Sequence, residues 1–288
     1  MRYGVTFAYF QRNSHCDLSR MIPIVAGLGF DLLEIDSSQL LGMDGGQLAA
    51  LQRLAADHQL ELIHSFNLGV QTDISSKDAS IRENGISYVC RILGQVAKVG
   101  GNCIGGINYV GWNCFEEQID PQKRWDNSVA SMFKIANVAA DYGIRYNLEV
   151  TNSYEQPLLN TAEQARRYCR EVGVSGLGIL LDVNHMIIEE DSFSQAILTA
   201  GPLLSHFHVA ENNRKVPVGR GFLPWQEMKA ALDKIGYNNT ITLEPLVLSG
   251  GEIGRNARIW RDKCLDDRPE GLAAELKEGL VFIKGVFG

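Results

Sequence analysis

The sequence predicts a single α/β domain folded as a TIM (β/α)8 barrel. Three observations support this prediction. The chain has 288 residues, of which 45% are hydrophobic, enough to bury one large core. Eight short runs rich in Ile, Leu, Val and Tyr recur along it, and stretches with helical periodicity lie between successive runs. Several of these helical stretches end at a glycine, as helices often do.

The elements follow one another in regular order from the N-terminus. Each run has about five to seven residues and little polar alternation, which is typical of parallel strands buried on both faces. The stretches 45–58 and 128–143 repeat apolar residues every three to four positions and predict helices. The predicted strands are 3–7, 31–36, 61–66, 103–108, 145–150, 177–183, 204–210 and 240–245.

A doubly wound sheet is the alternative architecture for such a pattern. Its usual signature, a glycine-rich GxGxxG or GxxxxGK[ST] loop after an early strand, is missing from this sequence. No low-complexity linker divides the chain, so we expect one domain over residues 1–288.

Charge and cysteine content limit the possible partners and compartment. The net charge is -7 with Lys and Arg scattered, so we expect no binding to nucleic acid or to an anionic membrane. The six cysteines form no CxxC pair, which favours a reducing, cytoplasmic location. We expect neither a secretory signal nor a membrane span, because no apolar run is long enough.

The last four predicted strands each end with a side chain that can bind a metal ion. These side chains are Glu149, Asp182, His208 and Glu244, in "NLEV", "LLDV", "HFHV" and "TLEP". In a TIM barrel the carboxyl ends of the strands meet at one face, so the four groups should lie together. Three carboxylates crowded there would repel one another unless a divalent cation lay between them. The sequence therefore predicts a metal site.

The ligand types indicate which metal and which chemistry to expect. Carboxylates and an imidazole without a thiolate suit Mn²⁺, with Co²⁺ or Mg²⁺ as alternatives, better than a structural zinc. His206 shares the inward face with His208 but lies one layer deeper, so we interpret it as a core or supporting residue. Glu149 and Glu244 come from opposite sides of the set. They could remove a proton beside a carbonyl on one face and return it on the other.

The motifs at these strand ends resemble those of the D-tagatose 3-epimerase family, which includes the D-psicose (D-allulose) 3-epimerases. The resemblance implies a xylose-isomerase-like barrel and Mn²⁺-dependent epimerisation of free ketoses at C3 through a cis-enediolate. It also implies a homodimer or homotetramer. The matching segments are "YNLEVTNSYEQ" (146–156), "LLDVNHMIIEE" (180–190), "HFHVAENNR" (206–214), "GRGFLPW" (219–225) and "TLEP" (242–245).

The resemblance also assigns roles to individual residues. Glu149 and Glu244 would be both metal ligands and the acid/base pair, and Asp182 and His208 would complete the metal's protein ligands. Three further residues would hydrogen-bond the carbonyl end of the sugar: Glu155, His185 and Arg214. Without the resemblance, these three could equally be a loop acid, a helix cap and a surface cation.

Other positions around the expected sugar pocket match or depart from the family. Trp112, in "YVGWN", matches a tryptophan that walls the pocket. Thr6 and Leu246 stand where aromatic residues are usual, and Ser65 and Asn67 replace a usual cysteine and glycine. These departures leave the metal centre intact. They predict a differently shaped distal pocket, suited to L-ribulose, D-tagatose or a larger keto-sugar.

Four other functions remain open at this point. An aldose–ketose isomerase would move a proton between C1 and C2, and a lyase or isomerase could act on a 3-oxo-glycoside. An abasic-site endonuclease would need a basic groove and a zinc site rich in histidine, whereas this chain has six histidines and a negative charge. A non-enzymatic sugar-binding barrel would not need carboxylates on both faces of its ligand.

Overall fold

The computed structural model describes residues 1–115 and 118–288. In this part of the chain, eight parallel strands follow one another in sequence order around a closed barrel. The barrel closes where β1 (Arg2–Thr6) pairs with β8 (Thr240–Leu243). The prediction of a (β/α)8 barrel is therefore confirmed. The other strands are β2 (Leu32–Asp36), β3 (Glu61–Ser65), β4 (Cys103–Gly105), β5 (Arg145–Val150), β6 (Leu177–Asp182) and β7 (Leu204–Val209).

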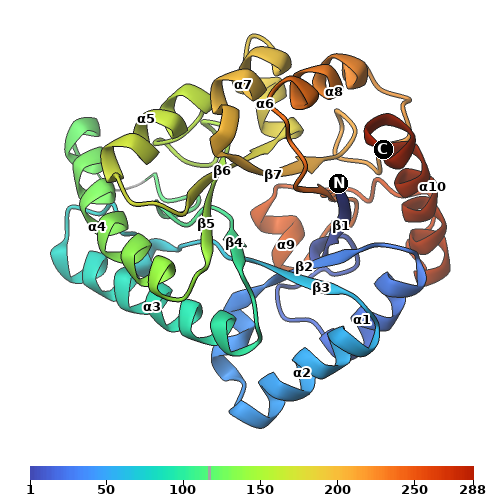
Figure 1. The fold of residues 1–288 in the computed structure, drawn as a ribbon, viewed down its shortest axis with the longest axis horizontal. Helices are drawn as coiled ribbons and strands as arrows, with labels where there is room; N and C mark the ends of the chain where they lie inside the picture. Colours follow the sequence, from blue (N-terminus) through green and yellow to red (C-terminus); the bar gives the residue numbers. More distant parts are fainter. Residues whose placement is uncertain (116–117) are drawn as a thin grey trace.

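Helices surround the barrel and cover the outer faces of the strands (Figure 1). The outer ring comprises α1 (Leu18–Gly27), α2 (Gly45–Asp57), α3 (Ala79–Lys98), α4 (Pro121–Asp141), α5 (Ala162–Val172), α7 (Phe193–Ala200), α8 (Trp225–Lys234) and α10 (Pro269–Phe287). The shorter α6 (Val183–Glu189) and α9 (Gly251–Asn256) lie among the loops that follow β6 and β8. Short 3₁₀ turns are η1 (Phe7–Tyr9), η2 (Ser37–Gly42), η3 (Val70–Thr72) and η4 (Gly201–Leu203).

Local sequence explains where several helices begin and end. The capping box of Asp44 and Gln47 starts α2, and glycines with φ between 67° and 89° follow α1, α3, α4 and α8. Helix α4 starts seven residues before the periodic stretch 128–143, so that predicted boundary is wrong. The Asp120 side chain accepts a hydrogen bond from the Lys123 N–H, and Pro121 occupies the first turn.

Two predicted strands extend two or more residues past the observed ends, and both errors lie at the carboxyl end of the barrel; the other predicted strands differ by at most one residue at either end. β4 stops at Gly105 instead of 108 because Gly106 has a φ of 107°, which leaves the strand conformation. β8 stops at Leu243 instead of 245, because Pro245 has no N–H to donate to the sheet. Glu244 therefore lies one residue beyond its strand, held by its N–H bond to the Val209 carbonyl at 2.9 Å.

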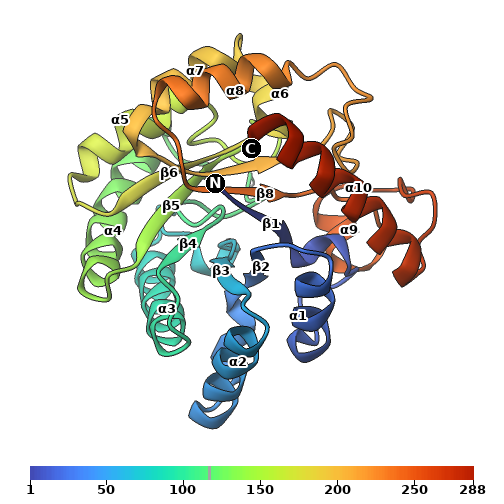
Figure 2. The same ribbon diagram turned by 45° about the vertical axis from the view of Figure 1, so that its right-hand side comes forward.

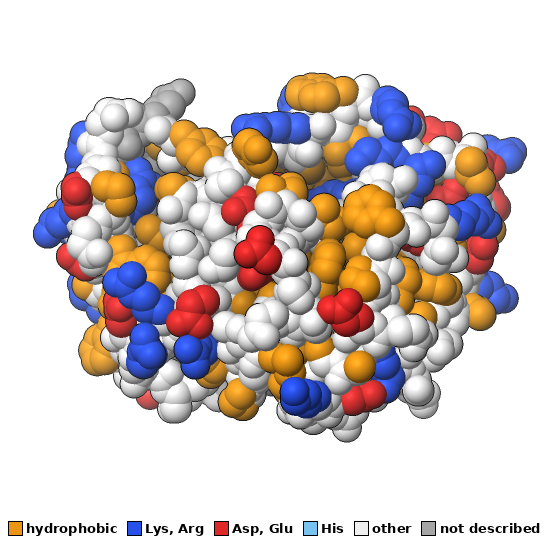
Figure 3. Space-filling model, turned by 90° about the horizontal axis from the view of Figure 1, so that it is seen from above, with side chains coloured by type: hydrophobic (Ala, Val, Ile, Leu, Met, Phe, Trp, Pro, Cys, Tyr) orange, Lys and Arg blue, Asp and Glu red, His pale blue; other side chains and the backbone are white. Residues whose placement is uncertain are grey.

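The core fills the barrel interior and the layer between the barrel and the helices. Figure 2 shows the outer helices from the side, packed around the strands. Acidic and basic side chains are interspersed on the side of the molecule drawn in Figure 3. Among the described residues, no helix combines the length and the apolar character that crossing a bilayer requires.

Candidate active site

The four predicted metal ligands lie at the carboxyl ends of β5 to β8. Glu149 is the penultimate residue of β5, and Asp182 ends β6 and caps α6 by accepting a hydrogen bond from the Asn184 N–H at 3.0 Å. His208 Nδ1 lies 3.3 Å from Glu244 Oε2 and 3.9 Å from Glu149 Oε1. Within the described residues, Glu149 belongs to two groups of possible metal ligands whose donor atoms lie within 4.8 Å of one another. One group adds His208 and Glu244, and the other adds Asp182 and His185.

The charges in this cluster fit a divalent cation. Burial and the neighbouring Glu244 carboxylate raise the pKa of Glu149 well above its usual value. Burial lowers the pKa of His208, but the carboxylates of Glu34 and Glu244 outweigh it and raise that pKa well above its usual value. The buried acids thus attract positive charge to their centre. Three carboxylates and one imidazole are a donor set that a hard divalent ion accepts.

Glu34 is a functional candidate that the sequence analysis missed. It lies in β2 with only 2% of its surface exposed, and its Oε2 accepts a hydrogen bond from His208 Nε2 at 3.0 Å. The same oxygen lies 3.1 Å from His206 Nε2, whose ring contacts the Thr240 hydroxyl through Nδ1 at 2.8 Å. His206 is therefore a buried neighbour of Glu34, one layer below the cluster. A carboxylate on Nε2 of His208 leaves Nδ1, the atom facing Glu149 and Glu244, free to bind a cation.

His185 and Arg214 lie beside Asp182 at one end of the cluster. Arg214 Nη2 donates to His185 Nε2 at 3.1 Å and to Asp182 Oδ2 at 3.4 Å. His185 Nε2 is also 3.8 Å from Glu149 Oε1. Burial lowers the pKa of His185 below its usual value, against the opposing effect of Asp182. The two predicted residues, His185 and Arg214, therefore both lie within 4 Å of acidic side chains of the cluster.

Glu155 lies on the other side of His185 and is held in place by two donors. Trp112 Nε1 donates to Glu155 Oε2 at 2.9 Å, and the Asn152 amide donates to Glu155 Oε1 at 3.0 Å. The Asn152 amide also contacts His185 Nδ1 at 2.7 Å. Burial raises the pKa of Glu155, but His185 and Arg214 bring it below its usual value, so the group is ionised. Asn152, which joins these residues, was not predicted from the sequence.

The loop after β7 owes its shape to a buried acid. Glu211 is 4% exposed, and its Oε1 accepts hydrogen bonds from the Val218 and Arg220 N–H groups, both at 3.0 Å. Arg214, on the same loop, has a φ of 59°, a conformation that is rare outside glycine and is often found at functional sites. Its carbonyl accepts a hydrogen bond from the Leu246 N–H at 2.9 Å. The loop is therefore fixed in the position that brings Arg214 to His185.

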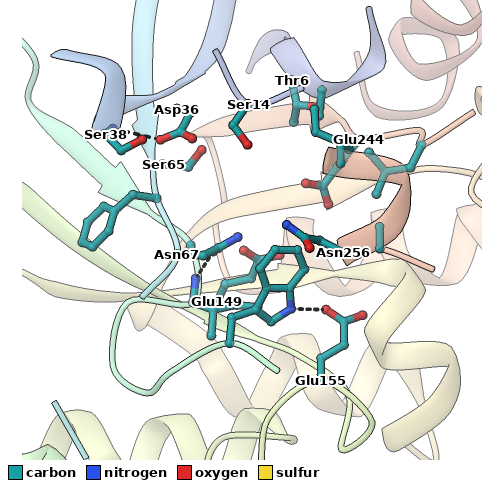
Figure 4. Close-up of a pocket in the computed structure, with 18 of the residues that line it drawn as sticks. Thr6, Ser14, Asp36, Ser38, Ser65, Asn67, Glu149, Glu155, Glu244 and Asn256 are labelled. Atoms are coloured by element: carbon teal, nitrogen blue, oxygen red, sulfur yellow. Dashed lines mark hydrogen bonds between the residues drawn. The ribbon is translucent and has the colours of Figure 1, made fainter. Parts of the chain in front are cut away.

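A cavity of about 460 Å³ opens over the cluster. Glu149 and Glu244 line it, while Asp182 and His208 lie beneath. Figure 4 shows Glu149 and Glu155 on one side, with Ser14, Asp36, Ser38 and Ser65 together across the cavity. All seven predicted substrate-binding residues line it: Thr6, Ser65, Trp112, Glu155, His185, Arg214 and Leu246. The sequence analysis missed several others: Ser14, Asp36, Ser38, Glu252 and Asn256.

Comparison with known proteins identifies the family. Residues 22–264 match the family model described as xylose isomerase-like TIM barrel. The D-psicose 3-epimerase of Ruminiclostridium cellulolyticum is 38% identical over 91% of this chain and 89% of its own length. The D-psicose 3-epimerase of Agrobacterium fabrum is 34% identical, and the match covers 100% of both chains. This chain belongs to the ketose 3-epimerase family.

The ketose 3-epimerase fold extends over the whole chain. A crystal structure of D-psicose 3-epimerase with D-tagatose from Clostridium cellulolyticum H10 has a TM-score of 0.97 and 36% sequence identity. That match covers 100% of this chain and 99% of the other. As a member of this family, the protein is an enzyme of the isomerase class. The resemblance found in the motifs is confirmed.

Proposed function

We propose that this enzyme epimerises free ketoses at C3. The observation that carries the proposal is the placement of two carboxylates, Glu149 from β5 and Glu244 from the end of β8, beside His208 Nδ1 in one cavity, at 3.9 and 3.3 Å. The names of two relatives that match 91% and 100% of the chain support the same reaction class.

The two glutamates would move the proton. One carboxylate removes the proton from C3, and the electron pair left behind forms the enediolate across C2 and C3 of the substrate. The other glutamate then delivers a proton to the opposite face of C3, which inverts that carbon. This needs the carboxylates to lie on opposite faces of the sugar, as their origin from β5 and β8 allows. After the reaction one glutamate has gained a proton and the other has lost one, so the total number of protons is unchanged.

His185, Arg214 and Glu155 would hold the carbonyl end of the ketose. Arg214 offers N–H donors for the C1 and C2 oxygens, while ionised Glu155 accepts from hydroxyls. The pairing of Arg214 with His185 and Asp182 fixes its planar donor group before substrate binds. Trp112 shields this end from solvent and orients Glu155.

Metal dependence is part of the proposal. We propose Glu149, Asp182, His208 and Glu244 as the protein ligands of one divalent cation, with Mn²⁺ as the first choice and Co²⁺ or Mg²⁺ as alternatives. When bound, the cation would polarise the ketose carbonyl and so acidify the C3 proton.

Proton exchange in D₂O tests the proposal. Protein loaded with Mn²⁺ and incubated with a panel of ketoses should incorporate deuterium at C3, detected by NMR. Glu244→Gln should abolish exchange, whereas the control Glu83→Gln, at an exposed ion pair with Lys134, should leave it unchanged. Deuterium at C1 would indicate an aldose–ketose isomerase instead. No exchange with any ketose would refute the proposal.

A further inference from the structure

The outer part of the cavity differs in character from the catalytic part. Its lining is polar on the wall across from Glu149, where Figure 4 shows Asp36, Ser38 and Ser65 side by side. Ser14 joins them from the loop after β1. Hydrogen-bonding groups thus continue away from the two proposed catalytic glutamates, although apolar residues such as Phe7, Tyr88 and Ile253 also line the cavity.

Asp36 is the central acid of this outer region. It ends β2 and accepts a hydrogen bond from the Ser38 N–H at 2.9 Å, which caps η2. The Ser38 side chain also hydrogen-bonds Asp36, so two of the about four acceptor positions of the carboxylate are used. Asp36 is only partly buried and lines the cavity, so its remaining acceptor positions are available to a ligand. Its place at the end of a barrel strand makes it as rigidly positioned as the catalytic acids.

The rim above Asp36 is built by two segments that are far apart in sequence. Glu252, in α9, accepts a hydrogen bond from the Ser14 N–H at 3.2 Å, and its own N–H donates to the Asn13 side chain at 3.1 Å. The Ile253 N–H donates to the Arg12 carbonyl at 3.0 Å. These contacts fix the rim and keep the outer region open as a defined pocket rather than a gap between loops.

Charge in the outer region selects against anions. Asp36 and Glu252 both line it. Of the described residues that line the cavity, Arg214 is the one Lys or Arg, and it is engaged with His185 and Asp182 at the catalytic end. A phosphate at the distal end of a ketose would therefore meet carboxylates and no cation. Neutral hydroxyl groups, by contrast, can donate to both acids.

The size of the cavity agrees with a ligand larger than a single sugar. Its volume of about 460 Å³ falls in the range that accommodates drug-sized ligands, and a free ketohexose is smaller than these. We propose that the outer region is a subsite for a second sugar unit, so that the preferred substrate is a ketose carrying a neutral glycosyl group on its distal carbons, with Asp36 as the main hydrogen-bond acceptor. This inference rests on the proposed C3 epimerase activity.

A substrate panel tests the subsite in the Mn²⁺-loaded, full-length enzyme. The panel comprises D-fructose, its 4-O-, 5-O- and 6-O-glycosyl derivatives and its 6-phosphate, and kcat/KM is measured from deuterium incorporation at C3. At least one glycosyl derivative should exceed free fructose by tenfold or more, and the phosphate should fall below it. Asp36→Ala should reduce the advantage of the glycosyl derivative over free fructose about tenfold, the effect of one hydrogen bond to a charged group.

A control variant, Asp78→Ala, distinguishes loss of the proposed sugar subsite from loss of a helix cap. Asp78 caps α3 by accepting from the Ser80 N–H at 2.7 Å, as Asp36 caps η2, but it lies outside the cavity. Asp78→Ala should leave the glycosyl advantage unchanged. Turnover of free ketoses with no advantage for any glycosyl derivative would overturn the subsite alone, as would an unchanged advantage in Asp36→Ala. No C3 exchange with any ketose would refute the epimerase function and the subsite together.

Discussion

Glu34→Gln is the substitution that best tests how the proposed metal-binding cluster is held in place. Glutamine has the same shape, but it replaces a carboxylate oxygen with an NH₂ group and removes the charge that faces His208 and His206. Burial raises the pKa of Glu34, but the two imidazoles lower it below its usual value, so the wild-type group is ionised. The substitution therefore removes a charged hydrogen-bond acceptor from Nε2 of His208 and leaves the proposed ligand atoms in place.

The expected magnitude follows from the 3.0 Å bond between Glu34 and His208 Nε2. A hydrogen bond to a charged partner contributes about 1.5–3 kcal/mol, and losing the carboxylate behind a metal-binding histidine weakens metal affinity about 10–100-fold. We expect the Kd for Mn²⁺ to rise by about that factor. At saturating Mn²⁺ the value of kcat should change much less, because Glu149 and Glu244 remain.

Competition titration with a metal-binding dye measures the Kd directly. Glu61→Gln is a suitable control, since this glutamate is also on a barrel strand but pairs with Arg2 at the opposite end of the barrel. A Kd within twofold of wild type in Glu34→Gln, with the fold intact by circular dichroism, would refute the idea that Glu34 orients His208. A large fall in kcat at saturating metal would assign Glu34 a more direct part in the reaction.

Four further predictions concern stability. Loading the protein with the proposed Mn²⁺ and then removing it with a chelator should lower the Tm by about 5 °C, because a ligand at a hundred times its Kd contributes about 2.7 kcal/mol to the free energy of unfolding. Gly106→Ala should cost about 1–3 kcal/mol in urea denaturation, since its φ of 107° is unfavourable for alanine and its Cβ would collide with the Phe66 carbonyl. Gly94→Ala, in α3, should instead add about 0.5–1 kcal/mol. Arg12 and the Ser249 N–H lower the pKa of Asp262 to about 2 from its usual 3.8, so its stabilisation is complete above pH 3.8 and is lost as the pH falls through 2. Asp262→Asn should remove that loss, which is at most about 1 kcal/mol at this exposed position, in denaturation curves at pH 5 and pH 2.5.

The strands could be predicted from sequence because a barrel strand is buried on both faces and reads as a continuous apolar run. The bounds of the predicted strands 145–150 and 204–210 agree with those of β5 and β7 to within one residue. Prediction failed where backbone conformation rather than side-chain character ends an element. Gly106 ends β4, and α6 begins at Val183, an apolar residue that directly follows the last residue of β6. Only the Asp182 cap separates the strand from the helix.

The candidate ligands could be predicted because each ends one of four consecutive strands. Glu34 was missed although a similar signal was present, an acid within the apolar run "LLEID" that cannot be buried without a partner. Glu34 lies on β2, whereas the predicted ligands lie at the ends of the adjacent strands β5 to β8. Its partner, His208, lies 174 residues away in sequence, and only closure of the barrel brings β2 and β7 to one centre.

The inner and outer halves of the cavity are therefore formed by different parts of the fold. This explains why the type of reaction can be predicted from the sequence more readily than the substrate. The inner end, which carries the proposed catalytic residues, is formed by strand ends and by side chains that hydrogen-bond one another, such as Glu34 with His208 and Trp112 with Glu155. The outer end depends on α9 and on the loop at residues 12–14. Hydrogen bonds join these two segments, although their residues are 238 and 239 positions apart in sequence. Substitutions at this rim can change the space beyond the sugar without disturbing the two glutamates. Amino-acid substitutions at the rim of such a barrel should thus change which ketose is bound more readily than they change the proposed proton transfer.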